Sequence, residues 1–449
     1  MPVIKRVFFI ALAALLLITA ACWGYWSYRQ YRSYQTTIPS AATSLVRIHV
    51  DGLIRDIVWN VLWNGAHYRS TAGGQPHALR GAQTGSAIPA NLFLYQIDHP
   101  LSGEFPGIYF GSVAVKDPAA FAAWLHSQFQ MEVSQGQYGT IASSARCLVV
   151  IRPTRALFAL LPTKPKSDLT ALTEILADML QQDGGNVPVS KSDFHGITHD
   201  RGQVCVRTSH HRFAIGFKNG KVSFSGHYET GHPPGPLADM PHFADSNTAS
   251  LWVQDDLAGF LQGRKFDIGD HTLYGDSLLR YYHGHLAMEW KGTTTQRDTI
   301  VNYDYDDNFE LIETREVVDK TVPEIYASIA ADSALIGYLE REGGMRGIFP
   351  LFQVNTSTAP SGYVQFHTAP QPRTLPSGVA ANNDLLSLRV DFSKLRASDL
   401  PAVIAPHIQA VESLELLGRP VSGGGVAVQA LLRMENPRLH SLIQLIDLH

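Results

Sequence analysis

The sequence carries little charge and no excess of basic residues. Its 449 residues contain 36 Lys and Arg against 40 Asp and Glu, and only 17% of them are charged. Binding to nucleic acid requires a concentrated positive surface, so this balance argues against a nucleic-acid partner. Because 45% of the residues are hydrophobic, the composition also excludes a disordered chain. At about 150 residues per domain, the length predicts two or three domains.

Short catalytic motifs are missing as well. The sequence holds no GxSxG elbow, no HExxH and no paired Cys/His signature. Gly423 to Gly425 precede a strand pattern, whereas a phosphate-binding loop leads into a helix, so these glycines predict a hairpin connection. We therefore assign no catalytic residue and no cofactor, and a role other than catalysis is favoured.

Only one long apolar run is present. Residues 7–26 form an uncharged stretch of 20 residues, which as a helix matches a hydrocarbon core of about 30 Å. Trp23, Tyr25 and Trp26 at its end are typical of the headgroup region. The run predicts a single-pass helix in a lipid bilayer. A short N-terminal tail usually stays in the cytoplasm, which places the protein in the cell inner membrane with its C-terminal domain in the periplasm.

Two kinds of processing remain open for this segment. The small residues Thr19 to Ala21 suit a signal-peptide cleavage site, and Cys22 follows two alanines as in a lipoprotein. A cleaved apolar region usually has about 7 to 15 residues, and Thr19 is polar where a lipoprotein signal usually has an aliphatic residue. A retained signal-anchor is preferred, with cleavage or a lipoprotein anchored at Cys22 as the alternatives.

The chain has only three cysteines. With Cys22 in the apolar run, Cys147 and Cys205 form an even pair in a compartment that permits disulfides. The pair is a candidate disulfide. The alternative is two buried thiols that pack as small hydrophobes.

Apolar periodicity predicts an α+β module after a linker near residues 36–40. Strands are expected at 44–50, 91–97, 107–115 and 137–143, with helices after Asp51 and from Pro118. This order of elements is that of a ferredoxin-like β-α-β-β-α-β unit.

The same pattern recurs near the C-terminus. Leu385, Val390 and Asp391 match Leu45, Val50 and Asp51. We therefore expect a duplicated ferredoxin-like ectodomain with additional antiparallel strands, although short apolar patterns also recur by chance. The expected parts are an anchor and linker at 1–38, a first domain at 39–240 and a second at 245–449. In the second domain, a capping box at Thr321 to Glu324 predicts the start of a helix.

Histidine is abundant, with 19 residues. His283 and His285 would lie on the same face of a strand, and this spacing lets two imidazoles share one metal ion. A third ligand must come from elsewhere in the fold. These two residues are candidate metal ligands, and hydrogen-bonded structural histidines are the favoured alternative.

Residues 302–313 imitate the oxygen-ligand spacing of a calcium loop that ends in Glu313. Asp307 stands where such a loop requires glycine, and the flanking residues favour strands over helices. A β-hairpin that turns at 306–308 is therefore preferred, with a weak calcium site as the alternative.

Several of these segments together resemble a known group of proteins. They are the apolar N-terminus, the strand ending in Val50-Asp51, the strand leading into 116–121, and the terminal segment 434–443. These segments are similar to uncharacterised cell-envelope proteins of Bacteroidota with domains of unknown function. The resemblance implies an extracytoplasmic protein with no assigned activity, and it supplies no catalytic residue.

Two hypotheses for function follow. The first is a membrane-anchored extracytoplasmic protein that binds an envelope protein, glycan or lipid without catalysis. The second is a metal-dependent hydrolase that uses His283 and His285.

Overall fold

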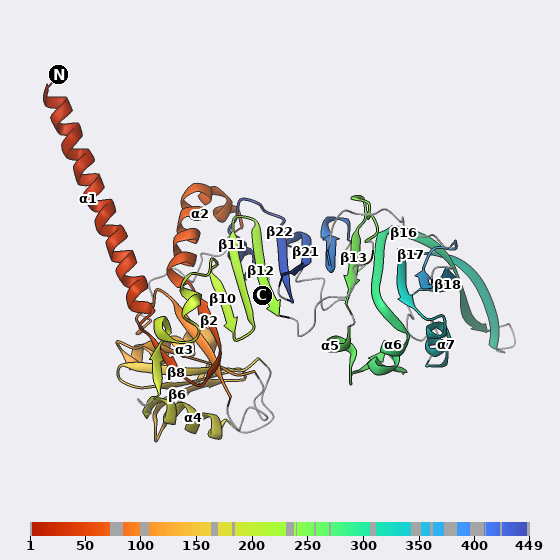
Figure 1. Cartoon of the computed structure of the whole chain (residues 1–449), viewed down its shortest axis with the longest axis horizontal. Coiled ribbons are helices and arrows are strands. Elements are labelled where there is room, and N and C mark those ends of the chain that lie inside the picture. Colours follow the sequence, from red (N-terminus) through yellow and green to blue (C-terminus); the bar gives the residue numbers. More distant parts are fainter. Residues whose placement is uncertain are drawn as a thin grey trace. The chain divides into compact units, whose positions relative to one another are not determined.

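The chain forms two compact units, shown in Figure 1. The computed structural model describes residues 2–71, 84–98, 107–162, 169–181, 185–229, 238, 240–255, 257–268, 271–305, 311–342, 352–359, 362–371, 384–395, 408, 410–422 and 424–446. The first unit comprises Met1–Asn219 and Arg438–His440, and the second comprises Gly220–Pro437 and Ser441–His449. The division thus lies between Asn219 and Gly220, upstream of the boundary expected at 240–245.

The first unit combines four helices with eleven strands among its described residues. Its helices are α1 Pro2–Ser33, α2 Val50–Thr71, α3 Pro118–Phe129 and α4 Thr170–Gln181, with short 3-10 turns η3 Val189–Lys191 and η4 His195–Thr198. Its strands are β1 Thr37–Pro39, β2 Ala42–Ile48, β3 Leu92–Ile97, β4 Tyr109–Ala114, β5 Glu132–Gly136, β6 Gly139–Ser144, β7 Cys147–Ile151, β8 Arg155–Leu160, β9 Asn186–Pro188, β10 Val204–Thr208 and β11 His211–Lys218.

Nine of these strands make one antiparallel sheet in the order β5-β6-β7-β8-β4-β3-β2-β10-β11, and β1 pairs with β9 as a separate ribbon. Strands β7 and β8 are apolar at consecutive positions because both faces of the sheet are covered there. Leu148 and Val150 pack towards α4, whereas Val149 and Ile151 pack towards α3. Alternation along the strand therefore divides the apolar side chains between two cores.

Helix α3 begins where its sequence predicts. The Asp117 side chain accepts hydrogen bonds from the backbone N–H groups of Ala119 and Ala120, both at 3.0 Å. Pro118 occupies the first turn, where its missing N–H costs nothing. Phe121 and Leu125 then reach the core on this face of the sheet.

The second unit is also built around a sheet. Its strands are β12 Lys221–Glu229, β13 Ala249–Gln254, β14 Lys265–Ile268, β15 His271–Tyr274, β16 Tyr282–Tyr305, β17 Leu311–Ala331, β18 Asn355–Ala359, β19 Tyr363–His367, β20 Leu386–Asp391, β21 Val411–Val421 and β22 Gly425–Met434. Its helices are α5 Ala258–Leu261, α6 Gly275–Tyr281, α7 Ala334–Arg341 and α10 Ser441–Ile446, with a 3-10 turn η5 Phe392–Lys394. Nine strands pair antiparallel in the order β18-β19-β17-β16-β13-β20-β21-β22-β12.

The longest hairpin of the second unit, β16 with β17, decides two predictions. It pairs Tyr305 with Leu311, which confirms strands on both sides of the predicted turn and leaves the turn itself outside the described residues. The capping box at Thr321 to Glu324 does not start a helix, because these residues lie inside β17 and pair with Gly292 to Thr295 of β16. A long partner strand supplies the ladder hydrogen bonds that the local helix signal cannot outweigh.

The predicted duplicated ferredoxin-like α+β architecture is wrong. Eighteen strands among the described residues belong to antiparallel sheet. Several single elements lie where the periodicity placed them, but β2 and β3 are antiparallel neighbours and β4 pairs with β3 and β8. In a ferredoxin-like unit the two strands joined by a helix run parallel and are separated by a third strand, whereas α2 connects β2 and β3, which are antiparallel neighbours. Periodicity along the chain shows which residues form strands and does not show which strands pair.

The predicted membrane anchor is also contradicted. Helix α1 contains the apolar run, yet no helix in the described part of the chain is long and apolar enough to cross a membrane. The transmembrane signal-anchor over 7–26 is therefore wrong, and so is the placement in the inner membrane with a periplasmic domain that depended on it.

Candidate ligand-binding cavity in the first unit

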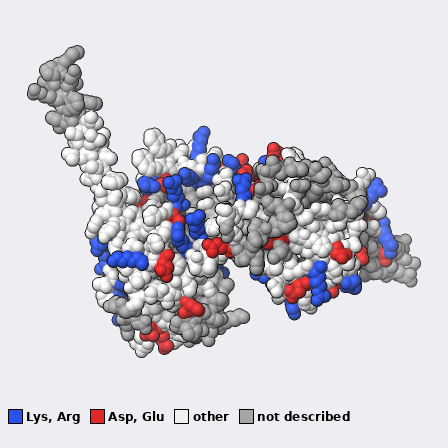
Figure 2. Space-filling model, viewed as in Figure 1, with Lys and Arg blue, Asp and Glu red and all other residues white. Residues whose placement is uncertain are grey.

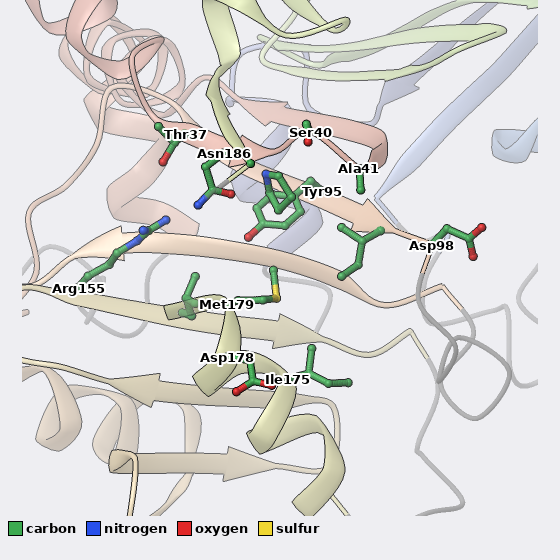
Figure 3. Close-up of a pocket in the computed structure, with 14 residues that line it drawn as sticks. Thr37, Ser40, Ala41, Tyr95, Asp98, Arg155, Ile175, Asp178, Met179 and Asn186 are labelled. Carbon is green, nitrogen blue, oxygen red and sulfur yellow. The ribbon is translucent and has the colours of Figure 1, made fainter. Parts of the chain in front are cut away.

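A cavity of about 330 Å³ lies in the first unit, at the edge of its larger core (Figure 3). Ligand pockets in proteins begin at about this size. Its lining comes from five elements and their flanking loops: Thr37, Pro39, Ser40, Ala41, Tyr95, Ile97, Asp98, Arg155, Leu157, Ile175, Asp178, Met179, Gly185 and Asn186.

Strands β3 and β8 supply the wall formed by the sheet. Tyr95 and Ile97 are two residues apart on β3, and Arg155 and Leu157 are two apart on β8, so each pair lies on one face. Strand β4 lies between β3 and β8 and fixes their separation. The sheet thus places a phenol and a guanidinium on the same wall as two apolar side chains.

Helix α4 and the β1–β9 ribbon close the other sides. Ile175 and Met179, one turn apart on α4, pack partly against the core formed around Leu172 and Leu176. In the ribbon, Ile38 is buried in the same core, so its neighbours Thr37 and Pro39 are left to line the cavity. The cavity is therefore lined by apolar side chains of the sheet and of α4 together with polar groups from β3, β8 and the ribbon.

Tyr95 is the most deeply buried polar residue of the lining, with 4% of its surface exposed. Burial raises the pKa of its hydroxyl to about 12, although the nearby positive charge of Arg155 lowers it in part. The hydroxyl consequently remains protonated at neutral pH and can donate a hydrogen bond. Within the described ranges, no side chain or backbone group accepts from it.

Arg155 provides the positive charge of the cavity. One of its Nη atoms donates to the Ser112 hydroxyl at 3.1 Å, which leaves its remaining N–H donors for other acceptors. In Figure 3 its side chain extends towards Tyr95, and Asp98 lies at the far end of the lining. Asp98 and Asp178 are exposed, so solvent screens their negative charge more than it screens the charge of the partly buried guanidinium.

Figure 2 shows acidic and basic side chains intermixed on the visible surface, with neither sign dominating.

The two predicted metal ligands lie in the second unit and do not line this cavity. His283 is exposed, whereas His285 is partly buried and its Nε2 lies 2.7 Å from the Tyr363 hydroxyl. A register shift and the left-handed backbone of Gly284 interrupt the strand between them. The described residues gather no group of three or more His, Cys, Asp or Glu side chains that could hold a metal. Metal binding at His283 and His285 stays a prediction.

The two cysteines of the candidate disulfide are free thiols in the structure. Cys147 begins β7, where burial raises its pKa to about 11. Cys205 is fully buried on β10, and its Sγ lies 3.1 Å from an Nη of Arg47. Burial raises the pKa of the Cys205 thiol, and Arg47 partly offsets this increase.

Arg47 organises a second buried polar cluster. Only 4% of its surface is exposed, and its guanidinium donates to the Tyr34 hydroxyl and to the backbone carbonyls of Ile197, Asp200 and Gly202, at 2.7 to 3.2 Å. These bonds tie the segment after α1 to the loop before β10. Because its acceptors belong to the fold itself, we assign Arg47 a structural role.

The residues of the cavity are not among the candidates that the sequence predicts. Tyr95 and Arg155 interrupt or begin otherwise apolar strands, and a polar side chain at an inward position was the available signal. The pairing of β3 with β4 and of β4 with β8, which brings them together, leaves no trace in the spacing of residues along the chain.

Comparisons with known proteins add little to this geometry. No family model and no curated protein matches the sequence. Among solved structures, crystal forms I, III and IV of TP0453 are similar at 9%, 8% and 8% identity, with TM-scores of 0.22, 0.20 and 0.20. Each match covers 74% of this chain and 92%, 93% and 92% of the other. These TM-scores are too low to show a shared fold, and the resemblance to Bacteroidota envelope proteins stays a prediction.

Proposed function

We propose that the first unit is a binding module for a small molecule with an anionic group and an apolar body. The anionic group binds between Arg155 and Tyr95. The apolar body lies against Leu157, Ile175 and Met179.

The observation that carries this proposal is the Tyr95 hydroxyl. Its residue is 4% exposed, the hydroxyl stays protonated at neutral pH, and among the described residues it has no acceptor. A ligand oxygen that accepts from this hydroxyl forms a hydrogen bond that contributes about 0.5–1.5 kcal/mol, and more when the acceptor is charged. This contribution favours a ligand with an acceptor over a purely apolar one.

Arg155 determines the charge of the preferred ligand. A guanidinium with free donors beside a neutral phenol provides hydrogen bonds to both oxygens of a carboxylate or to a phosphate. Charge-assisted bonds of this kind are about twice as strong as neutral ones. The two exposed aspartates of the lining oppose an anion less strongly, because water and salt screen them.

Isothermal titration calorimetry with matched probes tests the proposal. Octanoate and octylammonium share one apolar chain and carry opposite charges, and we expect the full-length protein to bind octanoate at least tenfold more tightly. Tyr95→Phe keeps the ring in the core and removes only the hydroxyl, so octanoate binding should weaken about tenfold, equivalent to about 1.4 kcal/mol. Arg155→Met should abolish the preference for the anion.

Two matched variants serve as controls. Tyr109→Phe removes a hydroxyl from β4, and Arg146→Met removes an exposed positive charge, and neither residue lines the cavity. Both should bind octanoate as the unaltered protein does. Equal affinity for the two probes, or an unchanged affinity in Tyr95→Phe, would contradict the proposal.

A further inference from the structure

Helix α2 is oriented with its polar face inwards. Asp51 is 5% exposed and forms a two-point ion pair with Arg29, at 2.9 and 3.0 Å. Asp56 accepts from the Gln203 amide at 2.8 Å. A surface helix normally buries its apolar stripe and turns its charged residues to water, so these contacts are the reverse of the usual arrangement.

Further along the helix, Asn60 continues the inward polar face. It is 3% exposed, donates to the Arg438 carbonyl at 2.8 Å and accepts from the Tyr68 hydroxyl. From Asp51 to Asn60 these polar contacts extend over about two and a half turns of the helix. Because buried polar groups must keep their partners, they fix the rotation of α2 about its own axis.

The outward face of α2 is apolar as a consequence. Five large side chains are exposed by 44% to 79%: Ile54, Val58, Trp59, Leu62 and Trp63. They form two rows with a spacing of four residues, which are ridges on the helix surface. Arg55 is exposed beside the patch, and its positive charge is offset by Asp56, with which it forms an ion pair at 3.3 Å.

The exposed area is sufficient for a dimer. Taking about 250 Å² for a fully exposed tryptophan and less for aliphatic residues, the five side chains present roughly 600 Å². Monomeric proteins rarely leave an apolar patch of this size uncovered. Two copies that bury it against each other remove roughly 1,200 Å² from water, above the about 1,000 Å² of a specific interface.

We infer that the outward face of α2 is a homodimer interface, in which the ridges of one copy pack against those of a second copy around a two-fold axis. A neutral apolar patch is complementary to itself, and two helices with ridges at four-residue spacing interlock in the commonest class of helix packing. The tryptophans provide the large central side chains that dominate the free energy of most interfaces.

Sedimentation velocity of the full-length protein over a micromolar concentration series tests this interface. We expect a monomer–dimer equilibrium for the unaltered chain. Trp63→Glu, which places a charge in the patch, should weaken dimerisation at least tenfold, whereas Trp63→Phe should largely retain it. Since Trp63 is 79% exposed, neither change should affect the fold, which circular dichroism checks.

Two controls separate α2 from other apolar surfaces. Phe260→Ser removes a side chain of the second unit that is 57% exposed, and Leu17→Ser removes one of α1 that is 71% exposed. Both variants should still dimerise. If Leu17→Ser dissociates the dimer and Trp63→Glu does not, the interface belongs to α1 and the inference is overturned.

Cross-linking gives a second measurement. In a Cys22→Ser background, Leu62→Cys should form an intermolecular disulfide under mild oxidation, because residues near a two-fold axis approach their own copies. Asn219→Cys, at an exposed position of the same unit, should not. A chain that is monomeric at all concentrations, or one that co-sediments with phosphatidylcholine vesicles through Trp63 without self-association, would overturn the inference.

Discussion

The two units share a type of sheet and differ in what covers it. Each has nine described strands in one antiparallel sheet. In the first unit, the buried apolar residues of the described chain form clusters of sixteen and nine residues on the two faces of the sheet, below α4 and α3. In the second, the corresponding clusters have six and three residues. An antiparallel sheet can leave one face to solvent. The same type of sheet can therefore carry large apolar cores, as in the first unit, or bury fewer apolar residues, as in the second.

This comparison predicts the largest effect for a core residue of the first unit. Leu176 on α4 is fully buried in the larger cluster, so Leu176→Ala should lower the free energy of unfolding by about 3 kcal/mol. Leu335 on α7 has a smaller cluster around it and is 5% exposed, so Leu335→Ala should cost about 2 kcal/mol. Hydrogen exchange followed by mass spectrometry measures both, through peptides of β7 and of β17.

Each substitution acts as the control for the other. Leu176→Ala should reduce the protection of β7 and β8, whereas Leu335→Ala should reduce that of β17 and β19. A larger loss for Leu335→Ala than for Leu176→Ala would show that the smaller cluster of the second unit is not the weaker one.

The next effect concerns the buried charges. Arg47 of the first unit donates to three backbone carbonyls, and Arg47→Met would remove these three hydrogen bonds, at a cost of about 2 kcal/mol. Glu289 of the second unit is 2% exposed and accepts from the Asn247 amide at 2.9 Å, with Lys291 at 3.7 Å. Glu289→Gln retains an acceptor for Asn247 and should cost less than about 1 kcal/mol.

Urea unfolding of these two variants measures the difference. Arg47→Lys serves as a control, because an ammonium keeps the charge but cannot reach several carbonyls from one planar group. It should recover only part of the stability that Arg47→Met loses. A full recovery would show that charge, and not the set of hydrogen bonds, makes Arg47 important.

The free energy of unfolding should also depend on pH, and this dependence should be steeper in the first unit than in the second. Burial, with help from Arg47 and Arg55, lowers the pKa of His49 in the first unit, and burial lowers the pKa of His440 there and of His285 in the second. The folded state therefore resists the proton that the unfolded chain accepts near pH 6.5. The contribution of these neutral histidines to the free energy of unfolding is fully present above about pH 6.5. It is lost as the pH decreases towards their pKa values in the folded state.

Thermal unfolding between about pH 8 and pH 5 checks this dependence. With two such histidines against one, the first unit should lose stability more steeply on acidification. His49→Gln should reduce the slope for the first unit, and His285→Gln should reduce it for the second. Stability that rises on acidification in either unit would contradict the assigned direction of these pKa values.

The sequence predicted local elements better than their assembly. The strand expected at 44–50 is β2 at Ala42–Ile48, and the helix expected from Pro118 is α3, because alternation and capping are properties of neighbouring residues. The pairing of β4 with β8 joins residues 41 to 51 positions apart and depends on how the whole sheet closes. The capping box at Thr321 failed for the same reason, since the opposing strand β16 determined its structure.

The sequence predicts the residues of the candidate cavity less well than it predicts the strands and helices. Tyr95 and Arg155 became functional candidates only once the sheet had placed them on one wall. His283 and His285 drew notice through their spacing alone, and the backbone at Gly284 shows that regular alternation does not hold between them. A spacing argument requires a regular strand, which one glycine with a left-handed backbone is enough to interrupt.

The smallest expected effect lies at the helix termini of the two units. Asp117 caps α3 with two hydrogen bonds at 3.0 Å, whereas Asp332 accepts one at 2.9 Å from Ala334 at the start of α7. Asp117→Ala should therefore cost about 1 kcal/mol and Asp332→Ala about half of that, since each lost bond leaves one more backbone donor to water. Asn at either position keeps an acceptor and should restore most of the stability, as urea unfolding would measure. Equal costs at the two sites would mean that the position of the carboxylate in the first turn, and not the number of its hydrogen bonds, determines the contribution of a cap.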